Sequence, residues 1–193
     1  MLYLLAGLAL LTTYLIIIYN NLVSLRNLFK NAYAQIDVQL QRRHELIPNL
    51  VESAKGYLKH ERDTLEAVIN ARNQASVANK KAAKNPVDPQ AIQAVSAAES
   101  LLSNAMGRFF ALAEAYPDLK ANETIQGLME ELITTENKVT FSRQAYNDAV
   151  MQYDTYTEQF PNNLVATRFS FKPATLLKIE DIAQKKAVNV SFS

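Results

Sequence analysis

The chain has 193 residues, a formal net charge of +1 and no cysteine. The lack of cysteine excludes disulfides, thiol nucleophiles and cysteine-zinc sites, and a nearly neutral chain without a basic block has no electrostatic footprint for nucleic acid. Glycine is scarce, with 4 residues, whereas good helix formers such as alanine and leucine are plentiful. These features predict an all-α protein with room for one domain and an accessory segment.

Residues 1–20 are predicted to form a transmembrane anchor. The stretch MLYLLAGLALLTTYLIIIY has no charged side chain, and the first charged residue of the chain is Arg26. A helix of about 18 such residues is roughly 27 Å long, close to the hydrocarbon thickness of a bilayer. Because the stretch lacks the basic start and the small-residue cleavage site of a signal peptide, we expect an uncleaved anchor that contacts membrane lipid through residues 1–18.

The charges that flank the anchor predict its orientation. Arg26, Lys30, Arg42 and Arg43 follow the span, and nothing basic precedes it. The positive-inside rule therefore predicts a single-pass protein of the inner (cytoplasmic) membrane, with the N-terminus outside and the body in the cytoplasm. The opposite orientation, with the body facing the envelope, remains an alternative.

Residues 21–160 are predicted to form an antiparallel helical bundle. From Leu22 onward, apolar residues recur every three or four positions, which indicates a long amphipathic helix that continues the anchor. Pro48 is expected to kink this helix, and a reversal is expected near Gly56. A second helix fades into a polar loop, in which Asp88 can cap a third helix that begins at Pro89.

A fourth helix is predicted to start near Asn122 and to end at Phe160. Its apolar residues alternate steps of three and four, the spacing of coiled-coil packing. Two long and two shorter helices with short connections indicate an up-down-up-down four-helix bundle. Residues 161–193 are predicted to form a short helix and an extended tail, and the alternation over 188–192 hints at a strand.

The two histidines are the first candidates for chemistry. His44 precedes Glu45 and His60 precedes Glu61, but a zinc-protease H-E-x-x-H helix would need a second histidine where the chain has Pro48. On a straight helix the two histidines would lie roughly 160° apart. No catalytic residue, metal or cofactor is therefore predicted.

Two groups of side chains receive structural interpretations. The charges before Pro48 are interpreted as a solvated, helix-stabilising cluster formed by Arg42, Arg43, His44 and Glu45. The aromatic residues of the fourth helix are interpreted as core or interface residues rather than as a ligand-stacking ladder. They form a candidate interaction seam: Tyr146, Tyr153, Tyr156 and Phe160.

Three stretches closely resemble the LemA family of bacterial membrane-anchored proteins. They are YNNLVSLRNLFKNAYAQIDVQLQRRHELIPNLVESAKGYLKHERDTLEAVINARNQA (19–75), FSRQAYN (141–147) and FPNNLVATRFSFKPA (160–174). The chain departs from the family pattern at Asp154, where asparagine is expected, at Ser170, where glycine is usual, and at Leu176 and Leu177, where aromatics are common. The resemblance implies a transmembrane N-terminal helix and a cytoplasmic bundle, and it supplies no established activity or catalytic residues. Some members of this family look like participants in membrane remodelling, including magnetosome formation.

The resemblance identifies the stretch around Pro48 as a family signature. We expect its residues to make polar contacts around the kink where helices meet: Arg42, Arg43, His44, Glu45, Pro48 and Asn49. The leading hypothesis is a non-enzymatic scaffold that forms homo-oligomers or recruits unidentified protein partners at the bacterial inner membrane. The alternatives are an envelope-facing ligand-binding bundle and a metal-dependent hydrolase that uses His44, Glu45 and His60.

Overall fold

A computed structural model describes residues 1–179 and shows an all-helical fold for this part of the chain, as predicted. The helices are α1 (Leu2–Ala54), α2 (Arg62–Lys84), α3 (Pro89–Glu114), α4 (Pro117–Lys120), α5 (Glu123–Glu158) and α6 (Asn162–Arg168). An extended segment, residues 171–179, follows α6 and is called the strap below. The strand hinted at over 188–192 lies outside the described residues.

The predicted anchor and the first body helix form one helix, α1, of 53 residues. Side chains 1–17 are exposed, and burial begins at Ile18, which is 2% exposed. The most apolar window of 18 residues has a mean hydropathy of 2.1 and is 6% buried, so α1 is long and apolar enough to cross a membrane and is not a core helix at this end. Pro48 lies inside α1 and does not end it.

Local capping signals set the starts of α3 and α5 as predicted. The carboxylate of Asp88 accepts a hydrogen bond from the backbone N–H of Gln90 at 3.0 Å, with proline in the first turn of α3. The side-chain oxygen of Asn122 accepts one from the N–H of Ile125 at 3.1 Å. Each cap satisfies a donor that the first turn leaves free. The short α4, which begins at Pro117, was not predicted.

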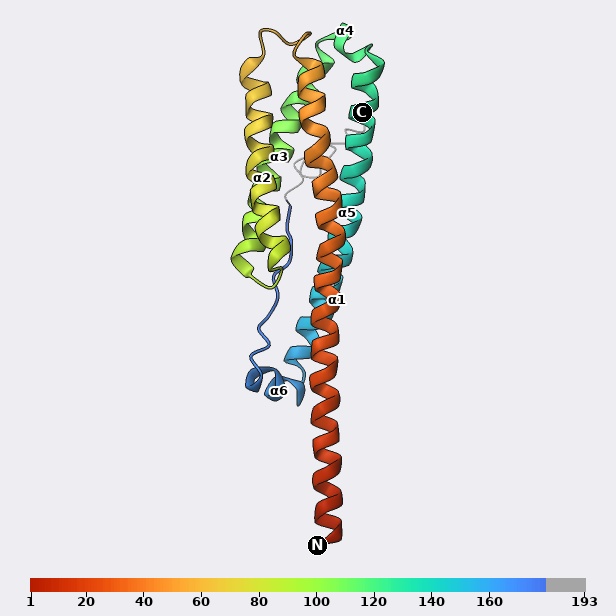
Figure 1. Cartoon of the computed structure of the whole chain (residues 1–193), viewed down its shortest axis with the longest axis vertical. Helices are drawn as coiled ribbons and strands as arrows, with labels where there is room; N and C mark the ends of the chain where they lie inside the picture. Colours follow the sequence, from red (N-terminus) through yellow and green to blue (C-terminus); the bar gives the residue numbers. More distant parts are fainter. Residues whose placement is uncertain (180–193) are drawn as a thin grey trace, which may run out of the picture.

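The long helices alternate in direction, as Figure 1 shows. α1 packs along α5, α2 packs along α3, and α1 also contacts α2. α5 has 36 residues, against 23 in α2 and 26 in α3, and its lower end lies beside α1 beyond the middle pair. A groove of about 550 Å³ opens between α3 and α5, and Met106, Phe110 and Leu132 are among its lining residues. Closed packing of all four helices therefore stays a prediction.

The core consists of two apolar clusters. One surrounds the stretch of α1 from Ile18 to Leu40, together with α5, α6, the strap and the adjoining ends of α2 and α3. The other surrounds the stretch from Leu46 to Ala54, together with α2, α3, α4 and the first turns of α5. Between these two stretches α1 carries Arg43 and His44, which are both buried. A polar layer therefore lies between the two apolar clusters.

The strap covers the α5 seam at Tyr146 and Tyr153. Tyr146 and Tyr153 are 0% and 1% exposed, and their hydroxyls donate to the carbonyls of Thr175 and Lys172 at 2.8 and 2.9 Å. Burial raises the pKa of both tyrosines, so both remain protonated donors at neutral pH. Heptad spacing is compatible with either a core or an interface position for these tyrosines, and both lie in the core. The strap therefore covers these two tyrosines within the chain.

The other two seam residues lie nearer the outside. Tyr156 is half-buried, and its hydroxyl accepts a hydrogen bond from the side-chain amide of Asn21 at 3.2 Å. Phe160 is 80% exposed. An interaction role for Phe160 stays a prediction.

The strap is held by hydrogen bonds to its main chain, in addition to the buried side chains of Phe171 and Leu177. The amide of Asn147 both donates to the carbonyl of Leu177, at 3.2 Å, and accepts from its N–H, at 2.9 Å. The carboxylate of Asp154 accepts from the N–H of Ala174 at 2.9 Å. Further along, Arg143 donates to the carbonyl of Ile179 at 3.0 Å. Polar side chains on one face of α5 therefore satisfy an extended backbone that pairs with no strand.

Replacing Asp154 with asparagine is expected to stabilise the protein at neutral pH. Burial raises the pKa of this carboxyl group, although the N–H of Ala174 partly lowers it. Asparagine keeps the acceptor and removes the partly buried charge, so Asp154→Asn gains roughly a few tenths of a kcal/mol, a small value because solvent screens the group.

The sign of this effect gives the prediction a pH dependence. An acid whose folded pKa is raised weakens folding above that pKa and has no such effect below its unfolded pKa of about 4. The gain should therefore shrink as the pH falls from 7 to below 4, measured by thermal unfolding of the two detergent-solubilised chains. A gain that is equal at both pH values would contradict the assignment.

Candidate functional site

Pro48 leaves one carbonyl of α1 without its helical donor. A proline has no N–H, so the carbonyl of His44, four residues earlier, cannot make its normal helix bond. The Nε atom of Arg72, on α2, donates to this carbonyl at 2.7 Å. The neighbouring helix therefore supplies the hydrogen bond that Pro48 removes, which ties α2 to α1 at this height.

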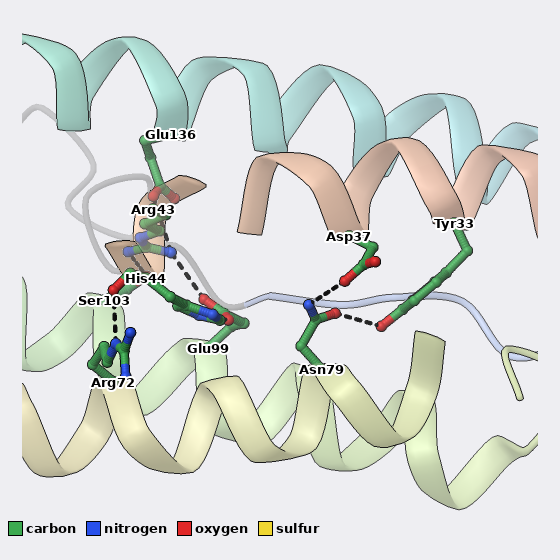
Figure 2. A network of polar contacts seen from close by, with 9 residues as sticks. All are labelled: Tyr33, Asp37, Arg43, His44, Arg72, Asn79, Glu99, Ser103 and Glu136. Carbon is green, nitrogen blue, oxygen red and sulfur yellow. Dashed lines mark hydrogen bonds and ion pairs between the residues drawn. The ribbon is translucent and has the colours of Figure 1, made fainter. Parts of the chain in front are cut away.

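One turn away, α3 places a carboxylate against α1. Glu99 is 0% exposed, and one of its oxygens accepts a hydrogen bond from Nη1 of Arg43 at 3.0 Å. Its other oxygen lies 2.8 Å from Nε2 of His44. Figure 2 shows both α1 side chains turned toward Glu99. Such a carboxylate is stable in the interior only because it has charged and hydrogen-bonding partners.

Arg43 extends the contact to α5. Its Nη1 lies 3.0 Å from an oxygen of Glu136 on α5, and its Nη2 donates to the hydroxyl of Ser103 on α3 at 3.1 Å. The planar guanidinium, with its five donors, suits this role, which a lysine could not fill. We call these five residues the Glu99 network: Arg43, His44, Glu99, Ser103 and Glu136.

The interpretation of the signature charges as solvated is wrong for two of them. Arg43 and His44 are 4% and 3% exposed, because they lie on the inward face of α1 opposite Glu99. Arg42 and Glu45 do face outward, and Arg42 forms an ion pair with Glu131 on α5. The expected polar contacts around Pro48 thus exist, but Arg43 and His44 make the buried ones.

Asn49 lies outside these contacts. It is exposed, whereas Pro48 is half-buried.

The structure does not bring together the three residues of the hydrolase alternative. His44 is buried against Glu99, Glu45 faces outward, and His60 lies exposed in the turn between α1 and α2. Across residues 1–179, no group of three or more histidine, aspartate or glutamate side chains is arranged to hold a metal ion. The His44–Glu99 pair resembles an acid–base pair in composition, but neither side chain is accessible to a substrate.

A second polar contact ties α1 to α2 lower in the bundle. The hydroxyl of Tyr33 donates to the side-chain oxygen of Asn79 at 3.0 Å, and the Asn79 amide donates to Asp37 at 2.6 Å. Burial, followed by the charge of Asp37, raises the pKa of Tyr33. Tyr33 therefore remains a donor at all physiological pH values, and Asn79, 1% exposed, both accepts and donates a side-chain hydrogen bond.

Sequence reasoning missed Glu99, although a signal was present. Glu99 lies in the apolar stripe of α3, at helical spacing from Ile92, Val95 and Leu102, all of which are fully buried. A glutamate at such a position requires buried partners, and the buried ionisable side chains of α1, Arg43 and His44, both lie in the signature. The pairing itself joins residues 55 and 56 positions apart, which no local pattern reveals.

Removing Arg72 is expected to matter only while Pro48 is present. Arg72→Met keeps the aliphatic stem but leaves the His44 carbonyl unpaired, which should cost about 1–3 kcal/mol. In Pro48→Ala the restored N–H takes that carbonyl, so the same Arg72 change should cost much less. A double-mutant cycle by thermal unfolding measures this coupling. Equal costs in both backgrounds would show that Arg72 does not compensate for the proline.

Removing the Glu99 carboxylate is expected to be strongly destabilising. Glu99→Leu leaves the Arg43 guanidinium with a single carboxylate partner, the partly exposed Glu136, besides the Ser103 hydroxyl, and it removes the carboxylate partner of His44, so we expect a loss of roughly 3–5 kcal/mol. The matched control is Glu131→Gln, which breaks the half-exposed pair with Arg42 and should cost below about 1 kcal/mol. Circular dichroism melts of both variants give the comparison, and similar losses would contradict the assigned role of Glu99.

Comparisons with known proteins agree with the fold and the signature. The LemA family profile matches residues 32–192. Magnetosome proteins MamQ 2 and MamQ 1 of Paramagnetospirillum magneticum are each 24% identical over 171 residues, which cover 81% of this chain and 63% of each relative. Magnetosome protein MamQ of Magnetospirillum gryphiswaldense is 24% identical over 175 residues, covering 83% of this chain and 64% of its own.

The chain thus spans less than two thirds of the length of these relatives. Neither the family description nor the relatives' names denote an enzyme. With the apolar half of α1, these relatives point to a membrane-associated protein. The family match covers most of the sequence, including the signature and the Glu99 network, and the chain therefore belongs to the LemA family.

Proposed function

We propose that this protein is a membrane-anchored, non-enzymatic scaffold that self-associates or recruits protein partners at the bacterial inner membrane. The observation that carries the proposal is the continuity of α1, which is exposed and apolar over residues 1–17 and buried in the body from Ile18 onward. An uninterrupted helix transmits position and orientation between a bilayer and a body, as a scaffold requires. The polar contacts of α1 with α2, α3 and α5 support the same role, because they fix the body to this helix.

The surface of the body offers apolar side chains to partners. On the exposed side of α5, Ile133, Phe141 and Met151 are 55%, 72% and 59% exposed. Apolar side chains of this size are more common where a surface meets another protein. The magnetosome names of the relatives, and the resemblance to proteins of membrane remodelling, favour a role in organising the membrane.

The orientation follows from the charges beside the span and is tested by cysteine labelling. The chain has no cysteine, so a single substitution gives a unique thiol. Val77→Cys, at a position 71% exposed on α2, should be protected from a membrane-impermeant maleimide in intact cells and react after lysis. Tyr3→Cys, at the other end of the span, should react without lysis. The reverse pattern would place the body in the envelope and favour the ligand-binding alternative.

Self-association is tested with the same single-cysteine chains in native membranes. Phe141→Cys should form a disulfide-linked dimer on mild oxidation, whereas Val77→Cys, on α2 away from that face, should not. The mass of the lipid-nanodisc complex provides an independent measure. A chain that stays monomeric at every concentration, with no cross-link at Phe141, would rule out the self-associating form and leave recruitment of other proteins.

A further inference from the structure

α6 lies beside the apolar half of α1 rather than beside the body alone. A cleft of about 510 Å³ between the two helices is lined mainly by apolar side chains, among them Leu15, Ile16, Tyr19, Leu164, Val165 and Phe169. The rings of Tyr19 and Phe169 meet edge to face, with centroids 5.0 Å apart. Figure 1 shows α6 at the lower end of the bundle, where α1 leaves it.

The outward side of this region is also apolar. Phe160, Leu164 and Phe169 are 80%, 61% and 56% exposed, whereas Val165 and Ala166 on the inner side of α6 are buried. Large apolar side chains that flank a short helix and face outward favour an apolar environment outside the protein as well as inside it. We call Phe160, Leu164 and Phe169 the foot.

The depth of α6 along α1 identifies that environment. A helix needs about 20 residues to cross the hydrocarbon of a bilayer. The residues of α1 that form the cleft with α6, from Thr12 to Tyr19, belong to the uncharged apolar stretch of α1 that precedes Arg26. The foot therefore lies at a depth that belongs to the membrane.

We propose that the foot inserts into the leaflet facing the bundle and that its ligand is phospholipid, with acyl chains against the foot and the adjoining cleft. The proposal rests on the proposed function, because it requires α1 to span the membrane. Continuity with the apolar surface of α1 distinguishes lipid from a protein partner as the occupant. Amphipathic side chains complete the arrangement: Tyr19 matches the aromatic belt of membrane interfaces, and Arg168 has a stem long enough to bring its charge to the phosphates.

The test uses the absence of tryptophan from the chain, which makes each introduced tryptophan a unique fluorophore. Full-length Leu164→Trp and Phe169→Trp are reconstituted in phosphatidylcholine–phosphatidylglycerol vesicles with acyl chains brominated near the headgroup. Interfacial side chains lie roughly 5–10 Å into the headgroup and acyl boundary, so emission should fall about twofold relative to unbrominated vesicles. Both positions are already exposed and apolar, and far-ultraviolet circular dichroism checks that the helices are retained.

Two control variants separate the proposal from the span on which it rests. Leu11→Trp reports the span itself, and Val77→Trp reports the body, so bromolipid should quench the first and not the second. If bromolipid quenches Leu11→Trp but only aqueous iodide quenches Leu164→Trp, the proposed insertion of the foot is overturned and the membrane span stays intact. Protection of Leu164→Trp from both quenchers would show that protein covers the foot, which also overturns the proposal. Absence of quenching at Leu11→Trp would overturn the membrane span and the proposed function with it.

Discussion

Glu99 is a carboxylate without access to solvent, so hydrogen-bond donors must surround it. This requirement constrains how the helices of the whole body pack. The two oxygens of Glu99 are satisfied only when Arg43 and His44 of α1 stand opposite it, and Arg43 in turn reaches Glu136 on α5. A slip of one turn between α1 and α3 would leave charges buried without partners, which costs several kcal/mol per ion. The network therefore fixes the relative heights of three helices whose apolar contacts alone would tolerate sliding.

The same polar layer separates the two apolar clusters of the core and explains the role of Pro48. The two apolar clusters are separated where α1 runs from Leu40 to Leu46. The hydrogen bond from Arg72 to the freed His44 carbonyl lies in this polar layer. An orphan carbonyl is a specific acceptor that an ordinary helix would not present to its neighbour. The proline thus creates a binding point for α2 without ending α1.

Features that depend on neighbouring residues were predictable, and features that depend on distant pairs were not. Asp88 and Asn122 could be recognised as helix caps because a capping side chain bonds a backbone N–H no more than three residues later. The signature was recognised, but its charges were interpreted as solvated because Glu99 is 55 positions from His44. The strap was expected only as an extended tail. The hydrogen bonds of the strap run from α5 side chains to the strap main chain, so the residue types of the strap reveal little about them.

The pairing of α1 with α5 has a consequence for how the chain is made. The helix that covers the apolar stripe of α1 is the last long helix of the sequence, beginning at Glu123 and ending at Glu158. Because α1 is synthesised before α5, the stripe from Leu22 to Leu40 stays uncovered while the α2–α3 hairpin forms from local contacts. Closing such a long loop is entropically costly and slow. During synthesis, the apolar face of α1 therefore stays exposed until α5 has been made and has docked.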